Sequence, residues 1–255
     1  MPTTQAAALD LQVYRKLNRR LLPFLACLYV IAYIDRVNIG FAKLTMAEQL
    51  GFSDSIYGLG AGIFFIGYFL FEIPSNLILH RVGAKIWIAR IMIVWGLLAA
   101  AMVFVSTPMQ FYILRFLLGV GESGFFPGII LYLTYWYPAP RRAKATATFM
   151  ASVALAGVIG SPLSGFIMTY LDGVSTLTGW QWLFLIEAVP AIILGIIVAF
   201  WLENGPEQAR WLTSDERKWL SIQLTAESLN KEQSEHIICF SKALCNSKLW
   251  LLSFT

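Results

Sequence analysis

The sequence contains few of the residues that usually form disulfide frameworks and metal sites. It has three cysteines and two histidines, and only 13% of its 255 residues are charged. Cys27 lies in an apolar stretch, whereas Cys239 and Cys245 lie in a polar stretch that we expect to be cytoplasmic, where disulfides are rare. His80 and His236 are far apart in the sequence. We therefore expect no disulfide framework, no metal site and no cofactor.

Hydrophobic residues, in contrast, make up 58% of the chain. They gather in six apolar segments, which are Leu21–Ala42, Ile56–Leu79, Trp87–Val105, Tyr112–Tyr135, Thr146–Tyr170 and Trp180–Leu202. A helix rises about 1.5 Å per residue, so each segment is long enough to cross a hydrocarbon core about 30 Å thick. The sequence therefore predicts an all-α membrane protein with a bundle of six transmembrane helices over residues 21–202.

The basic residues indicate how this bundle is oriented. Most of the 19 Lys and Arg residues lie before the first segment, between segments two and three, between segments four and five, or after segment six. The opposite side has Lys43 alone. Because short loops rich in Lys and Arg stay in the cytoplasm, we expect residues 1–20 and both chain ends to be cytoplasmic in a cell (inner or plasma) membrane. Basic residues spread over several segments also disfavour a nucleic-acid partner.

A polar stretch, residues 203–248, follows the sixth segment. Within it, Trp and Leu residues of Trp211–Leu224 recur at roughly helical spacing, and Thr213–Glu216 offers a capping start. We expect a cytoplasmic linker with an amphipathic helix, for which a place on the protein surface or at the membrane interface is favoured over partner binding. Residues 249–255 begin another apolar run and are predicted to start a truncated seventh helix.

Four charged residues lie where lipid-facing segments should be apolar. Asp35 and Arg36 lie in the first segment, and Arg115 and Glu122 lie in the fourth. An ionised group near the bilayer centre costs about 2.5–3.5 kcal/mol on insertion scales, so such residues usually have a function. Asp35 lies about 21 Å along its helix from Leu21, just beyond the midplane. Arg115 and Glu122 lie two turns apart on one helix face, so these positions can converge on one cavity.

Structural roles for these residues stay open at this point. Asp35 and Arg36 could form internal ion pairs that hold helices together, although adjacent residues point about 100° apart on a helix. Arg115 could serve an ion pair or could anchor its helix end by snorkelling to the outer surface. For Glu72 and Glu187 we favour packing or capping against neighbouring helices. No Ser/His, metal-ligand or paired-carboxylate arrangement of the usual kinds appears, so we do not expect an enzyme.

The placement of these charges also indicates a repeat. The first and fourth segments each carry an acid with an arginine nearby, as in transporters built from inverted three-helix repeats. Small residues allow close helix contact and bending in segments four and five, namely Gly119, Gly121, Gly124 and Gly128, and Gly157, Gly160, Pro162 and Gly165. Packing alone also explains these glycines.

Three motifs carry a family resemblance, which covers roughly residues 15–255. They are Asp35-Arg36-Val37-Asn38-Ile39-Gly40, Arg115-Phe116-Leu117-Leu118-Gly119 running into Glu122-Ser123-Gly124-Phe125-Phe126-Pro127-Gly128, and Gly179-Trp180-Gln181-Trp182-Leu183-Phe184. The chain resembles the amino-terminal half of a major facilitator superfamily transporter. Within that superfamily it is similar to the anion:cation symporters, and specifically to permeases for tartrate, sugar acids or hydroxyphenylacetate.

The resemblance implies proton-coupled symport of an organic carboxylate anion. Matched position by position, it implies protonation sites at Asp35 and Glu122, a residue near the substrate carboxylate at Arg36 and a basic partner at Arg115. It further implies cavity-lining aromatic residues at Tyr33 and Tyr68. Entry of an anion that engages an arginine can change the proton affinity of a nearby carboxylate, so the chemistry of these residues agrees with symport.

The sequence departs from the family in two respects. The loop between spans two and three normally reads Gly-x-x-x-Asp-Arg-x-Gly-Arg-Lys, but Asn76 and His80 replace its Gly and Asp. The family also has twelve spans, so the expected partners are a proton, an organic anion, the lipid bilayer, and the missing carboxyl-terminal half or a second chain. The alternative is a truncated, non-transporting six-helix membrane fragment, including one that assembles as a dimer.

Overall fold

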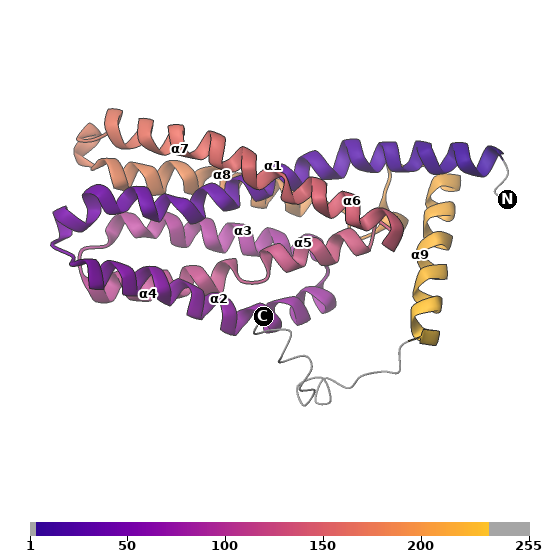
Figure 1. Cartoon of the computed structure of the whole chain (residues 1–255), viewed down its shortest axis with the longest axis horizontal. Helices are drawn as coiled ribbons and strands as arrows, with labels where there is room; N and C mark the ends of the chain where they lie inside the picture. Colours follow the sequence, from indigo (N-terminus) through magenta and orange to yellow (C-terminus); the bar gives the residue numbers. More distant parts are fainter. Residues whose placement is uncertain (1–3, 235–255) are drawn as a thin grey trace.

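The computed structural model describes residues 4–234, with the side chains of residues 9–227. Every described element is helical, and the elements are α1 (Thr4–Leu50), α2 (Asp54–Val82), α3 (Ala84–Ala101), α4 (Pro108–Glu122), α5 (Phe125–Thr134), α6 (Ala139–Met150), α7 (Ser152–Tyr170), α8 (Gly179–Trp201) and α9 (Ser214–Ser234), with short 3-10 turns at Met102–Phe104, Val174–Thr176 and Pro206–Gln208. Helices α1 to α8 lie side by side along the long axis, and α9 crosses beyond one end of them, near the start of α1 (Figure 1).

Six helical stretches of this described region are long and apolar enough to cross a membrane. They are Leu9–Leu50, Asp54–Val82, Ala84–Phe104, Pro108–Thr134, Ala139–Tyr170 and Gly179–Trp201. The predicted all-α bundle with six transmembrane helices is therefore confirmed. The predicted start of a seventh helix at residues 249–255 lies outside the described residues, as do His236, Cys239 and Cys245.

Two of the predicted spans consist of two helices each. The fourth breaks between α4 and α5 at Ser123 and Gly124, where Gly124 has a φ of +81° that favours glycine. The carbonyl of Ser123, at this break, accepts a hydrogen bond of 2.8 Å from the Ser75 hydroxyl of α2. The fifth span is divided at Ala151 into α6 and α7. Hydropathy alone does not detect such breaks, because it measures how apolar a segment is and not whether its helix is continuous.

The loops rich in Lys and Arg meet at one end of the bundle, which we call the basic end. Here the backbone N–H of Lys85 donates to the Asn204 side chain at 3.0 Å, and the Tyr137 hydroxyl donates to the Asn18 side chain at 2.9 Å. Arg142 pairs with Glu227 of α9 at 3.0 Å. The structure thus gathers the basic segments as the predicted orientation requires. The side of the membrane that this end faces stays a prediction.

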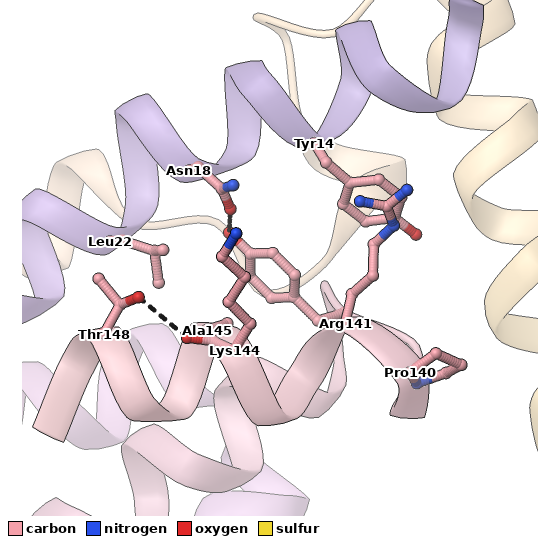
Figure 2. Close-up of a pocket in the computed structure, with 9 residues that line it drawn as sticks. Tyr14, Asn18, Leu22, Pro140, Arg141, Lys144, Ala145 and Thr148 are labelled. Atoms are coloured by element: carbon pink, nitrogen blue, oxygen red, sulfur yellow. Dashed lines mark hydrogen bonds between the residues drawn. The ribbon is translucent and has the colours of Figure 1, made fainter. Parts of the chain in front are cut away.

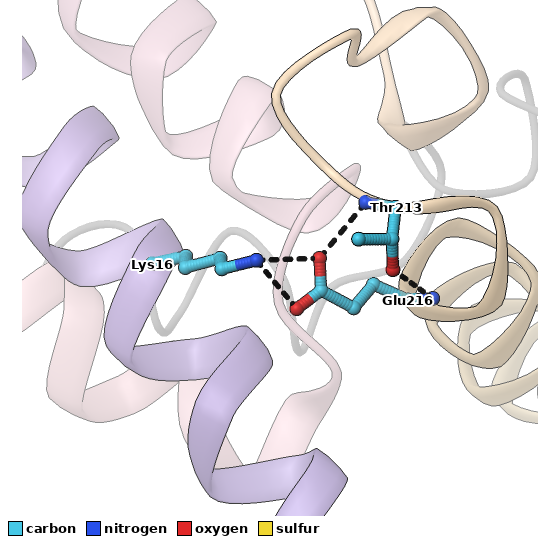
Figure 3. Close-up of polar contacts among 3 residues, drawn as sticks. All are labelled: Lys16, Thr213 and Glu216. Atoms are coloured by element: carbon cyan, nitrogen blue, oxygen red, sulfur yellow. Dashed lines mark hydrogen bonds and ion pairs between the residues drawn. The ribbon is translucent and has the colours of Figure 1, made fainter.

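Helix α9 is fixed to the basic end by a buried carboxylate (Figure 3). The backbone N–H of Thr213 donates to Glu216 at 2.9 Å, and the N–H of Glu216 donates to the Thr213 hydroxyl at 3.3 Å, which forms the predicted helix cap. Lys16 of α1 donates to both Glu216 oxygens at 2.7 and 2.8 Å. Burial opposes ionisation of Glu216, but the hydrogen bonds from Lys16 and Thr213 prevail and lower its pKa. The charged form therefore stabilises this contact, and the stabilisation is lost as pH falls through that lowered pKa.

Glycine allows α2 and α4 to approach each other closely. A Cβ atom at Gly119 of α4 would lie 2.0 Å from the Phe64 carbonyl oxygen of α2. On the other helix, a Cβ atom at Gly67 would lie 2.5 Å from the Phe116 carbonyl oxygen. Both obstacles are backbone atoms, which cannot rotate away. The predicted packing role is therefore required at Gly119, whereas Gly157 and Gly165 of α7 have open space at the same position.

We expect Gly119→Ala to destabilise the bundle by about 1–3 kcal/mol, because α2 and α4 must separate to admit the methyl group. The measurement is the thermal unfolding midpoint of the purified chain in detergent. Gly157→Ala is the matched control, and its midpoint should equal or exceed that of the wild type, since alanine favours helices. Equal midpoints for Gly119→Ala and the wild type would contradict the close approach.

Candidate functional site

Asp35 lies in the interior of the bundle with both carboxylate oxygens hydrogen-bonded. Asp35 is only 2% exposed. Trp95 of α3 donates its indole N–H to Oδ2 at 2.6 Å, and Asn38, one turn later in α1, donates to Oδ1 at 3.2 Å. These two donors come from different helices, so the carboxylate also joins α1 to α3. Charge-assisted bonds of this kind offset part of the cost of burying an ionised group.

Arg36, the next residue, extends toward a different helix. Its guanidinium forms an ion pair with Glu122 of α4, and it also lies 5.1 Å from the centroid of the Tyr68 ring. Glu122 is 1% exposed, whereas the Arg36 side chain is 31% exposed. The adjacent charges therefore point apart, as the helical spacing predicted. An internal ion pair, one of the structural roles that the sequence allows, does form, and it joins Arg36 to Glu122.

Arg115 is buried in α4, which contradicts the alternative that its side chain snorkels to the outer surface. The residue is 4% exposed, its Nε donates to the Gly60 carbonyl of α2 at 3.3 Å, and its guanidinium lies 4.7 Å from the Phe64 ring centroid. It interacts electrostatically with Asp35 and Glu122. We call Asp35, Arg36, Arg115 and Glu122 the charge cluster, because the structure brings all four together between α1 and α4 as the sequence predicted.

The two predicted aromatic residues differ in the contacts that they make. Tyr68 stacks against Arg36, whereas Tyr33 contacts Tyr29, with ring centroids 6.4 Å apart. Among the described residues, no hydrogen bond joins Tyr33 to the charge cluster. Tyr29 interacts electrostatically with Arg36 and Glu122. Sequence reasoning did not select Tyr29.

Two further residues of the site, Trp95 and Asn38, are not among the predicted site residues. Trp95 has no distinguishing signal, because a tryptophan in an apolar segment is common. Asn38 does have one, since it lies three residues after Asp35 on the same helix face.

Glu187 of α8, for which we favoured a packing role, accepts a hydrogen bond from Ser164 of α7 at 3.0 Å, and this bond does join two helices. Glu72 is half-buried in α2 and interacts with Tyr68.

Two buried atoms in the charge cluster lack a hydrogen-bond partner among the described residues. Within the described part of the chain, neither the buried Nε of Arg36 nor the buried Oε2 of Glu122 has a hydrogen-bond partner. A partly exposed guanidinium with a spare donor suits a planar anion, because guanidinium and carboxylate can form two parallel hydrogen bonds. As for metals, no group of three or more His, Cys, Asp or Glu side chains in residues 9–227 is arranged to hold an ion.

A separate cavity of about 410 Å³ lies at the basic end, between α1 and α6. Figure 2 shows Tyr14 and Asn18 of α1 facing Arg141 and Lys144 of α6 across it. Arg141 is already engaged there, because it forms an ion pair with Asp10 and lies 4.2 Å from the Tyr14 ring centroid. This cavity contains none of the predicted site residues, so we place the candidate site at the charge cluster.

Comparison with known proteins identifies transporters among the relatives of this chain. A protein from Agrobacterium vitis named as a candidate tartrate transporter is 58% identical over 230 residues, which are 90% of this chain and 53% of that protein. A candidate metabolite transport protein from Pseudomonas putida is 53% identical over 240 residues, or 94% of this chain and 54% of that protein. The chain thus spans about half the length of the curated relatives it matches.

A solved structure supports the fold. The inward-facing, occupied form of a bacterial homologue of the human lysosomal transporter Spinster matches with a TM-score of 0.64, over 74% of this chain and 45% of that one. At 23% identity this likeness shows the fold alone. The family model of the Major Facilitator Superfamily matches residues 25–255. The chain therefore belongs to the Major Facilitator Superfamily, as its sequence predicted.

Proposed function

We propose that this chain is the amino-terminal half of a secondary active transporter that moves an organic carboxylate anion together with protons. The observation that carries the proposal is the ion pair between Arg36, which is partly exposed, and Glu122, which is buried. Burying a charge is costly unless it is paired, so whatever replaces either partner changes the charge that the other can hold.

This pair can couple an anion to a proton. A substrate carboxylate that engages Arg36 through two hydrogen bonds competes with Glu122 for the same guanidinium. Glu122 then loses its cation inside a low-dielectric site, where a proton is the remaining way to remove its charge. Anion and proton therefore bind together. Asp35 supplies a second carboxylate within the electrostatic reach of Arg115.

The substrate class and the orientation are part of the same proposal. The tartrate named for the Agrobacterium vitis relative is a carboxylate, which supports a tartrate-like, sugar-acid or aromatic carboxylate substrate. We place the protein in the cell (inner or plasma) membrane with its N-terminus and basic end in the cytoplasm. The opposite wall of the substrate cavity then comes from a carboxyl-terminal half or from a second chain.

The test uses a complemented transporter, which is this chain joined to the carboxyl-terminal half of the Agrobacterium vitis relative. Proteoliposomes that contain it should accumulate tartrate, a sugar acid or an aromatic carboxylate when the interior is more alkaline than the medium. Adding a proton ionophore should abolish the accumulation. Accumulation that persists after the proton gradient has collapsed would contradict proton coupling, and failure with every carboxylate would contradict the substrate class.

Arg36→Lys should weaken substrate binding about 10-fold, although it keeps the charge. The ammonium is a point charge that cannot offer two parallel donors, and one bond to a charged group is worth about 1.5 kcal/mol. The measurement is the dissociation constant of the best substrate with the complemented transporter. Arg90→Lys is the control. It changes a residue that stacks on Trp87 away from the charge cluster, and it should leave the dissociation constant unchanged. Equal affinity in Arg36→Lys would place the anion elsewhere, with Arg115 as the next candidate.

A further inference from the structure

Glu187 is a buried acid that the proposed coupling does not yet use. It lies in α8 and is 4% exposed. Its Oε1 accepts the hydrogen bond from Ser164 of α7, whereas its Oε2 is buried and has no partner in the part of the chain that the structure describes. One oxygen is therefore held in place, and the other is positioned to carry a proton.

Among the described residues, the groups that interact with Glu187 provide no positive charge. Asp35 of α1 is the charged residue that interacts with it, and Asn38 of α1 and Ser164 of α7 are its polar neighbours. Helix α3, which packs against α8, contributes Trp95, and that indole N–H bonds to Asp35. The nearby guanidinium groups of the charge cluster act on Asp35 and Glu122 instead.

Physical chemistry limits the charge that such an arrangement can hold. An ionised carboxylate in a low-dielectric interior needs a cation or several donors, and Glu187 has the Ser164 hydroxyl and the Asn38 amide beside it but no cation among the described residues. Two acids that interact in this environment resist ionising together, so their protons belong to the pair and not to either residue. Asp35 has two donors and neighbouring arginines, and it is therefore the member that can ionise. Glu187 is the member that keeps the proton.

We propose that Glu187 and Asp35 form a carboxylate pair that shares one proton, with Glu187 as the residue that holds it while Asp35 is ionised. The proposal rests on the proton-coupled function above and adds a residue of α8 to it. With the proton on Glu187 and Asp35 ionised, or with the reverse, the pair carries a single negative charge. In a purely structural role, Glu187 would only join α7 to α8 through Ser164.

The first test measures the proton itself. In the 255-residue chain in lipid nanodiscs, infrared spectra at neutral pH should contain the carbonyl-stretch band of a protonated carboxylic acid. Glu187→Gln should remove a component of this band. Glu72→Gln, which changes another intramembrane glutamate outside the pair, should retain that component. A band of equal intensity in Glu187→Gln and the wild type would overturn the proposal.

The second test separates coupling from structure. Glutamine can still accept the Ser164 hydrogen bond, so a structural role predicts normal accumulation by the Glu187→Gln complemented transporter. Our proposal predicts loss of proton-driven accumulation with retained exchange of internal for external anion, which needs no net proton movement. If the wild type accumulates and Glu187→Gln accumulates equally, the inference fails and the proposed function stands. If the wild type itself does not accumulate, the proposed function fails, and the infrared result still decides whether Glu187 holds a proton.

Discussion

Asp35→Asn and Glu122→Gln should each abolish proton-driven accumulation of the anion by the complemented transporter, leaving an internal concentration no higher than the external one. Both substitutions keep the shape of the side chain and remove the group that can take and release a proton. An amide at position 35 can still accept the Trp95 hydrogen bond, so insertion and folding should be preserved. The effect is a loss of coupling, because each substitution removes one of the carboxylates that must take up and release a proton for the gradient to drive uptake.

Accumulation of radiolabelled substrate in proteoliposomes with an alkaline interior measures this loss. Asp54→Asn is the control, since Asp54 is an exposed carboxylate whose ion pair with Lys43 lies at the opposite end of the bundle from the basic loops. It should accumulate substrate as the wild type does. Retained accumulation in both Asp35→Asn and Glu122→Gln would remove these residues from the coupling role and leave Glu187 as the acid to examine.

The 255-residue chain alone should show no proton-dependent uptake of any carboxylate, whereas the complemented transporter should. A substrate site between two repeat bundles needs both bundles, because alternating access is the rocking of one against the other. In this chain, Arg36 is already partly exposed in the absence of any second bundle. Exposing the charge cluster to lipid would cost several kcal/mol, at about 2.5–3.5 kcal/mol for each central charge.

Parallel uptake assays with sugar acids, tartrate and aromatic carboxylates compare the two proteins. Undetectable uptake by the chain alone agrees also with the alternative of a non-transporting six-helix fragment, and activity of the complemented transporter then shows that its charge cluster is competent. Saturable uptake by the chain alone that disappears with Asp35→Asn would contradict the prediction. Such a result would establish a functional half-transporter, which two copies could form.

The extent to which the fold could be predicted follows from what hydropathy measures. The apolar segments identify six spans because a bilayer requires about 20 apolar residues in a row. The same signal cannot locate helix ends in polar sequence, and α1 therefore continues to Thr4 and Leu50, well beyond Leu21–Ala42. On the amino-terminal side, Val13 and Leu17 are fully buried, which explains why this polar stretch is held as a helix.

The sequence predicts those residues of the candidate site whose charge is unusual in an apolar segment. Charged residues within apolar segments are costly, so Asp35, Arg36 and Glu122 stand out from the sequence alone. Their partners do not, because the pairing of Arg36 with Glu122 joins residues 86 positions apart. The choice between an inward and a snorkelling Arg115 likewise depends on the carbonyl of Gly60, which belongs to another helix.

The length of α1 has a mechanical consequence. Lys16, which fixes α9, and Arg36, which pairs with Glu122, lie on the same unbroken helix, about 30 Å apart along its axis. A helix of this kind moves as one rigid body. A rotation of α1 about its axis that moves Arg36 away from Glu122 therefore also turns Lys16 relative to Glu216. Pro23, which lies between the two contacts and lacks a backbone N–H, is the point at which this helix can bend. The stiffness of α1 around Pro23 therefore determines how far a movement of α9 is transmitted along the helix to the charge cluster.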